Sequence, residues 1–330
     1  MTLKASTGAP FARLYSVGSA TPSRVIDNEY LCQFIDSSDE WITQRTGISE
    51  RRWVSEDENI ETLSIAAATS ALDRSGIPRE QIDAVIVATI SHYYQTPALA
   101  PKLAGLLGLG DVAAYDISAA CAGFSYAIAQ AEALVRGGQA HYVLVIAGET
   151  ISDITDLTDR GTAFLFGDGA GAAVVGPSDT NGIGPVVWGS DGGQYDKIWM
   201  DNGIAGAVES GTFPTIRMDG QAVFKWATGY ITEATRRCLD VAGITADELD
   251  VFIPHQANNR ITDTMLRYLK LPEHVVVART IKTLGNNSAA TIPMAMDALL
   301  TSGEAKSGQT ALIIGFGAGL VYSGQVITLP

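Results

Sequence analysis

Apolar residues occur along this chain in short, nearly unbroken runs, with stretches of helical spacing between them. The first half has a helical stretch at about residues 63–75, the apolar run Ala84–Ala88, a helical stretch after Cys121 and the apolar run Tyr142–Ala147. Strands that are apolar on both faces are typical of sheets covered by helices on both sides. The alternation therefore predicts an α/β fold with mixed, mostly parallel sheets.

The same pattern recurs in the second half at a constant offset. Residues 72–77 resemble residues 239–244, a strand starts after both Asp83 and Asp250, and residues 144–148 resemble residues 311–315, each time about 167 positions apart. Chance similarity between apolar segments is the alternative, but three separated matches favour a duplication. We predict two pseudo-symmetric halves, residues 1–176 and 177–330, joined at the turn-rich segment Gly176–Gly182.

The duplication also predicts which loops converge. Sites in parallel sheets form beyond the carboxyl ends of the strands. The loop Thr89–Pro97 would correspond to Pro254–Asn258, and Cys121 to Ser288 in the turn Gly285–Ala290. Pairing the halves would therefore gather Cys121, His255 and Asn286 around one pocket, with the nucleophile from the first half and the other two from the second.

Cys121 stands where an apolar run ends in small residues and a predicted helix begins. The helix dipole and the free backbone N–H groups there are expected to favour thiolate over thiol, and a tight strand-to-helix turn presents a nucleophile. The alternative is an inert buried cysteine, which is common.

His255 and Asn286 also have structural alternatives. A lone histidine after a strand is usually structural, and asparagines after a glycine usually serve turns and helix caps. Asn287 fits that alternative better, and Asn286 is the better candidate to donate a hydrogen bond into the pocket.

A thiol beside two neutral hydrogen-bond donors suits acyl transfer through an enolate. Cys121 would accept an acyl group, and His255 and Asn286 would stabilise negative charge on a thioester oxygen. Papain-like proteases use the same three residue types in the same order. Their local sequence around the cysteine is missing here, and a protease would not explain the duplication.

Charge and cysteine content exclude several other classes. The net charge of −14 over 330 residues argues against a nucleic-acid partner. Three cysteines without paired spacing predict neither a disulfide framework nor a zinc site, and fit a reducing cytoplasm. No apolar run reaches the ~18 residues of a membrane span, and the N-terminus does not resemble a signal peptide. We expect a cytoplasmic protein without a membrane partner or metal.

Two glycine-rich segments, Gly167–Ala172 and Gly315–Gly319, run into strands and not into helices. The helix N-terminus that would hold a pyrophosphate is therefore missing. We interpret the first segment as a tight hairpin and the second as a turn that brings backbone N–H groups to the pocket. No dinucleotide or other cofactor is expected.

A positive stripe is predicted on the helix after His255. Arg260, Arg267 and Lys270 share one face at helical spacing, and Lys225 lies on a separate segment. Such residues are usually just solvated. In an acidic chain, a local positive stripe is also a reasonable docking site for a negatively charged carrier.

Taken together, these motifs resemble the thiolase superfamily, and within it β-ketoacyl-acyl carrier protein synthase III. The resemblance covers nearly the whole chain, in the segments Asp39–Ile42, Arg45–Ile48, Ala119–Phe124, Thr158–Thr162, Phe166–Ala170, Pro254–Asn258 and Gly285–Ala290. It implies a homodimer of five-layered α/β/α/β/α subunits. It also implies a triad of Cys121, His255 and Asn286 that condenses an acyl-CoA, a substrate and not a cofactor, with malonyl-acyl carrier protein and releases CO₂.

The resemblance further implies binding roles. The CoA adenine would lie between Trp41 and Arg160, and the CoA tunnel would be lined by Arg45, Gly220, Phe224, Ala257 and Asn258. Backbone N–H groups of Cys121 and Ala318 would form the oxyanion hole, and the acyl pocket would include Thr96, Ile151 and Phe316. The carrier protein would meet Lys225 and Arg260, with Arg267 and Lys270 beside them.

Some residues depart from the family pattern. Thr96 stands where some members have a Phe that closes the partner's acyl pocket, which suggests room for a branched or longer primer. Ala318 replaces a Gly but keeps its backbone donor. Asn287 stands where Thr is common and Leu284 where Tyr is usual, and the sequence explains neither change. Enzymes that elongate chains carry a second His where Asn286 stands, so Asn286 favours the CoA-primed type.

The pathway stays open at this point. Relatives that prime aromatic polyketides share these motifs, so fatty acid initiation, polyketide starter synthesis and plain acyl transfer are alternatives. A non-catalytic scaffold that binds acyl or CoA groups has no use for three convergent reactive side chains.

Overall fold

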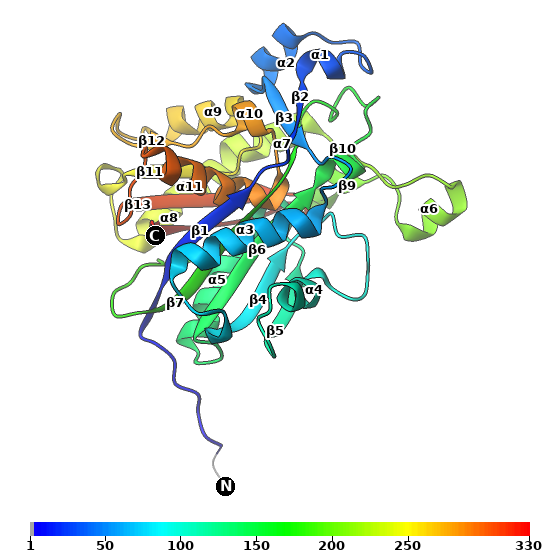
Figure 1. Ribbon diagram of the computed structural model, residues 1–330. Coiled ribbons are helices and arrows are strands. Elements are labelled where there is room, and N and C mark those ends of the chain that lie inside the picture. Colours follow the sequence, from blue (N-terminus) through cyan, green and yellow to red (C-terminus); the bar gives the residue numbers. More distant parts are fainter. Residues whose placement is uncertain (1–2) are drawn as a thin grey trace.

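The computed structural model describes residues 3–330 and contains two five-stranded sheets with equivalent strand orders (Figure 1). The first sheet has the order β1 (Phe11–Ala20), β7 (Asp168–Ser178), β6 (Tyr142–Thr150), β4 (Ile82–Ala88), β5 (Ala113–Ile117). The second has the order β8 (Val187–Ser190), β14 (Val321–Thr328), β13 (Thr310–Gly317), β11 (Val251–Pro254), β12 (Val276–Val277).

Both sheets are mixed, as predicted. In the first, β6, β4 and β5 are parallel, and β7 runs antiparallel between β1 and β6. In the second, β13, β11 and β12 are parallel, and β14 runs antiparallel between β8 and β13. One opposed strand in each sheet leaves four running the same way, which confirms the α/β class.

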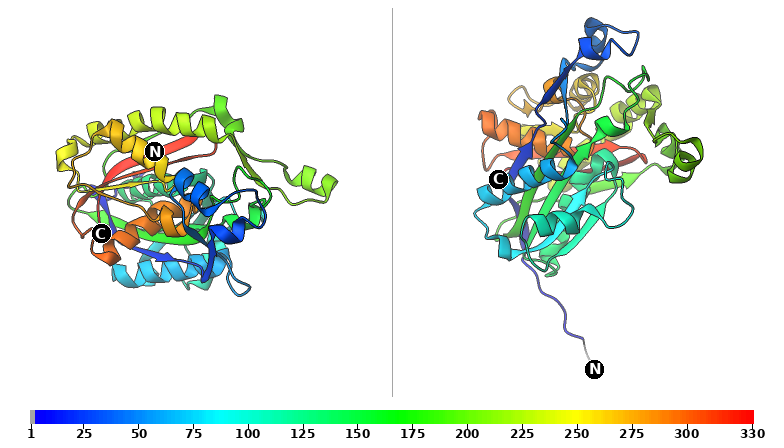
Figure 2. Two further views of the ribbon diagram at one scale, coloured as in Figure 1. Left: turned by 90° about the horizontal axis from the view of Figure 1, so that it is seen from above. Right: turned by 45° about the vertical axis from the view of Figure 1, so that its right-hand side comes forward.

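Helices and sheets stack in five layers, seen from above in Figure 2. The central layer is α5 (Gly123–Arg136) and α11 (Thr291–Ser302), whose buried side chains share one core with strands of both sheets. The outer face of the first sheet packs on α3 (Ile60–Ser75) and α4 (Leu99–Leu106). The outer face of the second packs on α8 (Thr232–Ala242) and α9 (Asn259–Leu269). The predicted α/β/α/β/α layering is confirmed.

The remaining elements form a cap over one end of the sheets, with its own apolar core. It contains α1 (Asn28–Leu31), α2 (Asp39–Thr46) and the ribbon of β2 (Arg24–Asp27) and β3 (Glu50–Trp53), next to α10 (Ile281–Leu284). A second ribbon, β9 (Ile198–Met200) with β10 (Ile216–Met218), carries α6 (Ile204–Ser210) away from the body, and α7 (Gly220–Trp226) leads into α8 (Figure 1).

The repeat gains one residue in the second half. The helices α3 and α8 end at left-handed Gly76 and Gly243, 167 positions apart. Two left-handed residues, Ala120 and Ser288, are 168 apart, as are the starts of β6 and β13. Cys121 is therefore equivalent to Ala289, and the expected equivalence with Ser288 is wrong by one position.

Two expectations about loops also differ from the structure. The predicted join Gly176–Gly182 begins inside β7, because Phe11 and Ala12 pair with Ser178 and Pro177 and extend that strand, and the rest of the segment follows it. The segment Gly167–Ala172 is not a hairpin, because it begins β7 and pairs with β6 and β1.

The glycines of that segment serve close packing. A Cβ atom at Gly171 would lie 2.6 Å from the Pro293 Cβ, and one at Gly169 would lie 2.5 Å from the Met294 Cε. Helix α11 can therefore approach β7 only where side chains are absent. No helix among residues 3–330 is both long and apolar enough to cross a membrane.

Candidate active site

One cavity of about 640 Å³ is lined by residues of both halves, including Cys121, His255 and Asn286. Cys121 lies in the short turn before α5, His255 follows β11 directly, and Asn286 precedes the equivalent turn before α11. Cys121 and Asn286 therefore stand just before the two central helices and His255 stands at the end of a strand, where the duplication predicted that loops converge.

The Cys121 thiol is enclosed although the residue is partly exposed to the cavity. Burial raises the pKa of Cys121 to about 12, against a smaller lowering by the Ser288 hydroxyl, and the Glu149 carboxylate raises it further. The expected thiolate at a helix start is therefore not what the free protein holds. Desolvation is the largest cause of this shift, and helix α5 itself begins only at Gly123, two residues later.

His255 is buried and neutral. Burial lowers the pKa of His255 to about 3, and its ring forms a T-shaped contact with the Phe316 ring, with the ring centroids 5.2 Å apart. Its Nδ1 lies 2.7 Å from the Thr291 Oγ1, so Nε2 is the ring nitrogen left for a molecule in the cavity.

Asn286 is oriented by its neighbours. The Ser288 N–H donates to the Asn286 Oδ1 over 2.9 Å, which leaves the Nδ2 group as the free donor. Asn287 has a structural role instead: its Nδ2 donates to the carbonyl groups of Asp168 and Leu284. Leu284 thus takes part through its backbone.

The mouth of the cavity combines aromatic rings and arginines. All residues predicted for CoA line it: Trp41, Arg45, Arg160, Gly220, Phe224, Ala257 and Asn258. The Arg160 guanidinium lies 5.4 Å from the Trp41 ring centroid, and that of Arg260 lies 5.5 Å from the Phe224 ring centroid. Both halves meet here, since the Asn258 side chain donates to the Arg45 carbonyl.

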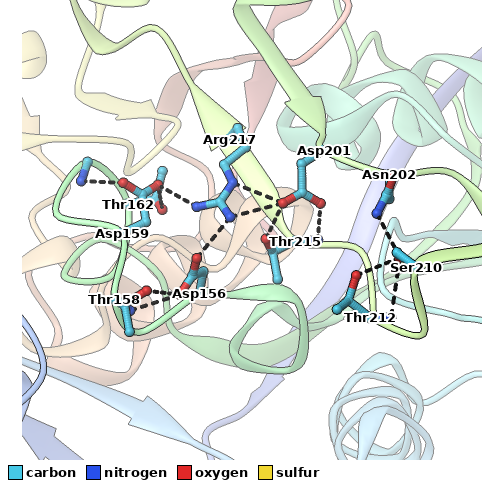
Figure 3. A network of polar contacts seen from close by, with 11 residues as sticks. Asp156, Thr158, Asp159, Thr162, Asp201, Asn202, Ser210, Thr212, Thr215 and Arg217 are labelled. Atoms are coloured by element: carbon cyan, nitrogen blue, oxygen red, sulfur yellow. Dashed lines mark hydrogen bonds and ion pairs between the residues drawn. The ribbon is translucent and has the colours of Figure 1, made fainter. Parts of the chain in front are cut away.

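A polar network near the mouth was not anticipated from the sequence (Figure 3). The Arg217 guanidinium on β10 forms ion pairs with Asp156, Asp159 and Asp201. The Asp159 carboxylate also accepts hydrogen bonds from the Gly161 N–H and the Thr162 hydroxyl. The loop that carries Arg160 is therefore held to the β9–β10 ribbon, by partners about 60 residues apart that no sequence pattern links.

Other predicted residues lie in different places. Ile151, Phe316 and Ala318 line the cavity, whereas Thr96 stands on an exposed loop away from it. Its predicted place beside the acyl pocket of a partner subunit therefore stays a prediction. Arg260 reaches the mouth, and Lys225, Arg267 and Lys270 are exposed outside it.

Sequence reasoning missed two kinds of residue. Apolar side chains complete the wall, from β9, β10, α7 and the segment before β7: Phe164, Leu165, Phe166, Ile198, Ile216, Met218 and Val223. Thr291 and Glu149 support the site from behind. For Thr291 and Glu149, the only sign in the sequence was a polar residue next to apolar ones. Within residues 3–330, no group of three or more His, Cys, Asp or Glu residues could hold a metal ion.

Comparison with known proteins agrees with this geometry. The family model of 3-oxoacyl-[acyl-carrier-protein] synthase III matches residues 115–192, and the model of its C-terminal part matches residues 239–329. The chain is 53% identical to a β-ketoacyl-[acyl-carrier-protein] synthase III of Streptomyces glaucescens, over 99% of each chain. It is 47% identical to one of Mycobacteroides abscessus, over 98% of this chain and 96% of the relative.

Solved structures agree as well. The priming β-ketosynthase of the R1128 polyketide pathway has a TM-score of 0.97 at 45% identity, covering 100% of this chain and 99% of that one. The 3-oxoacyl-(acyl carrier protein) synthase III of Pseudomonas aeruginosa has a TM-score of 0.89 at 36% identity, covering 97% and 98%. The chain therefore belongs to the β-ketoacyl-acyl carrier protein synthase III family, acyltransferases with the thiolase fold.

Proposed function

We propose that this enzyme condenses an acyl-CoA with malonyl-acyl carrier protein to a 3-oxoacyl-acyl carrier protein and CO₂, the step that initiates fatty acid synthesis. The observation that carries the proposal is the meeting of Cys121, His255 and Asn286 in one cavity whose mouth holds arginines and an aromatic ring. Three reactive groups converge there, while the entrance suits the phosphates and adenine of CoA.

In the first half-reaction, the Cys121 sulfur attacks the acyl carbon and the CoA thiol leaves. The developing oxyanion would be held by backbone N–H groups of Cys121 and Ala318. The turn at Gly317–Ala318 is close enough for this, since a Cβ atom at Gly317 would lie 3.0 Å from the Cys121 Sγ.

In the second half-reaction, malonyl-acyl carrier protein loses CO₂ and its carbanion attacks the acyl-cysteine. The His255 Nε2 and Asn286 Nδ2 groups would donate to the thioester oxygen and stabilise the enolate. This role requires the ring proton on Nε2. The Thr291 hydroxyl, 2.7 Å from Nδ1, can secure it by donating its own proton to Nδ1.

Partners and location follow from this reaction. The exposed cations Lys225, Arg260, Arg267 and Lys270 would meet an acidic carrier protein. A homodimer would cover β5, an edge strand of the first sheet. A nucleophilic free thiol suits the reducing cytoplasm.

Intact-mass analysis tests the proposal. Incubation with acetyl-, isobutyryl-, isovaleryl- and longer acyl-CoAs should add one acyl mass to Cys121, and added malonyl-acyl carrier protein should then release CO₂. Cys121→Ala should lose acylation and condensation. Acylation of the Cys121→Ala protein at the wild-type rate would show that another group is the nucleophile.

Polyketide starter synthesis is a second candidate, favoured by the likeness to a priming β-ketosynthase. The two differ in the carrier protein that accepts the primer. Presenting malonyl-loaded carrier proteins of both pathways in competition distinguishes them, since the physiological partner should be consumed first.

A further inference from the structure

Glu149 is a buried carboxyl group next to the nucleophile, and the reaction described above does not use it. It is the penultimate residue of β6 and is 0% exposed. Its two oxygen atoms have different surroundings. Oε2 accepts three hydrogen bonds, from the Ser91 hydroxyl at 2.6 Å and from the Thr89 hydroxyl and the Ile90 N–H at 3.1 Å each.

The other oxygen is nearly free. The Glu149 Oε1 accepts only a long contact of 3.4 Å from the Ala289 N–H. Three bonds on Oε2 hold the side chain in place without using Oε1. The carboxylate thus keeps an open acceptor on the side of the turn that contains Ser288 and Ala289.

Ser288 and Cys121 line the same cavity, and the turn of Ser288 packs against both the Cys121 turn and β6, which carries Glu149. The Ser288 hydroxyl is buried and has no partner of good hydrogen-bond geometry, yet it is near enough to the Cys121 thiol and the Glu149 carboxyl group to lower the pKa of each. Its N–H holds the Asn286 side chain, and its carbonyl oxygen lies 3.0 Å from the Thr291 Oγ1, whose proton can go either there or to the His255 Nδ1. The Ser288 backbone therefore contacts Asn286 and the Thr291 hydroxyl beside His255, and the Ser288 hydroxyl is left without a hydrogen-bond partner.

We propose that Glu149, acting through the Ser288 hydroxyl, accepts the proton of the Cys121 thiol during acylation. The inference rests on the proposed function, which makes Cys121 an acyl acceptor. As the sulfur bonds to the acyl carbon, the thiol proton passes to the Ser288 oxygen, and the Ser288 proton passes to the Glu149 Oε1. When the bond to the leaving sulfur breaks, the Ser288 hydroxyl donates its proton to that sulfur and takes one back from Glu149, which is a carboxylate again.

The electrostatics of the site favour a transfer of this kind. The free thiol is protonated, because burial raises the pKa of Cys121 to about 12, so its proton must leave during the attack. Burial also raises the pKa of Glu149, which makes its carboxylate a stronger base than one in water. His255 cannot easily store the proton, because burial lowers its pKa to about 3.

The test is the rate of Cys121 acylation in single turnover, by acetyl-CoA and by p-nitrophenyl acetate, followed by intact mass. The ester does not have to bind at a CoA site. Its reaction with Cys121 therefore tests the proton path independently of the proposed function. Glu149→Gln can keep all three hydrogen bonds on the Oε2 side through its amide oxygen. It should slow both reactions about 100-fold, in the range of general-base catalysis. Glu149→Asp should restore part of the rate.

Two further variants separate the proton path from mere support. Ser288→Ala should slow acylation to a similar degree, and the double variant should be no slower than either single one, because both lie on one path. Alanine tolerates the left-handed backbone there, as Ala120 does. Ser91→Ala, which removes a bond to Oε2 but leaves Oε1 untouched, should stay within a few-fold of wild type.

Malonyl decarboxylation in the Cys121→Ala background is the control for site geometry, since it needs no cysteine proton. Adding Glu149→Gln should leave its rate unchanged. Wild-type acylation rates for Glu149→Gln, or an equal loss of decarboxylation, would overturn the proposal. Wild-type protein that reacts with the ester but not with any acyl-CoA would instead reject the proposed function.

Discussion

At the scale of single residues, the site depends on hydrogen bonds that fix which atom faces the cavity. Asn286 presents its Nδ2 because the Ser288 N–H occupies its Oδ1. His255 depends in the same way on Thr291, whose hydroxyl can donate either to Nδ1 or to the Ser288 carbonyl. A neutral imidazole carries one proton, so this choice decides whether Nε2 donates or accepts.

We expect Thr291→Val to slow malonyl decarboxylation about 10- to 100-fold, because the ring proton is then no longer held on Nε2. Thr291→Ser should recover most of the rate, since it restores the hydroxyl. Measuring both in the Cys121→Ala background isolates this step. Equal rates for the Val and Ser variants would contradict a role for the hydroxyl.

At the scale of elements, glycines decide how closely the layers approach. Gly171 in β7 faces Pro293 of α11, and a Cβ atom there would lie 2.6 Å from the proline Cβ. Strand and helix would have to separate. Because α11 starts directly after the turn that contains Ser288, such a shift would also reach the active site.

Gly171→Ala should therefore lower the free energy of unfolding by about 1–3 kcal/mol, the usual cost of overpacking. Gly105→Ala is the matched control, since nothing lies within 4 Å of its added Cβ atom. That control lies within helix α4 and should be stabilised by up to ~1 kcal/mol. Urea denaturation measures both, and a neutral Gly171→Ala would refute tight packing there.

The Arg217 network is a second device at this scale, since one side chain joins β10 to the loop of Arg160 (Figure 3). We expect Arg217→Met to raise the KM for acyl-CoA about tenfold and to change kcat less, because Arg160 would lose its fixed place at the mouth. Arg136→Met, which breaks an ion pair on α5, is the control and should match wild type. A fall in kcat alone would contradict a role in binding.

At the scale of the whole molecule, each half supplies what the other lacks. Cys121 and Glu149 come from the first half, and His255, Asn286, Ser288 and Thr291 from the second. The cavity therefore exists only when the two sheets and the shared helical layer are assembled. Because His255 is buried and neutral where the halves meet, the stability of the folded chain also depends on pH.

The pKa of His255 is about 3 in the folded chain, below its usual 6.5, so the unfolded chain takes up a proton that the folded one excludes. Lowering the pH from 6.5 towards 3 should therefore cost stability, by up to about 1.4 kcal/mol per pH unit from this residue. His255→Gln should reduce that slope in urea denaturation between pH 6.5 and 4.5. The exposed His141→Gln should retain it, and equal slopes for both variants would contradict the linkage.

Much of the architecture could be predicted from the chain alone. Helix and strand alternation, the duplication and the meeting of Cys121, His255 and Asn286 near strand ends follow from local patterns and from one topological rule. These features need only short-range periodicity, which the order of residues states directly. The one-residue shift of the repeat was not visible in the sequence, because a single inserted residue in a loop leaves the local patterns on both sides unchanged.

What could not be predicted depends on the surroundings that folding creates. The Cys121 thiol is protonated because packing removes water from it, which the position of Cys121 at a helix start did not indicate. The Gly167–Ala172 segment became a strand because β1 and β6 supply partners on both sides. Glu149, Ser288, Thr291 and Arg217 gained their places from contacts between distant segments. Desolvation and long-range contacts are properties of the assembled molecule, since no local pattern encodes them.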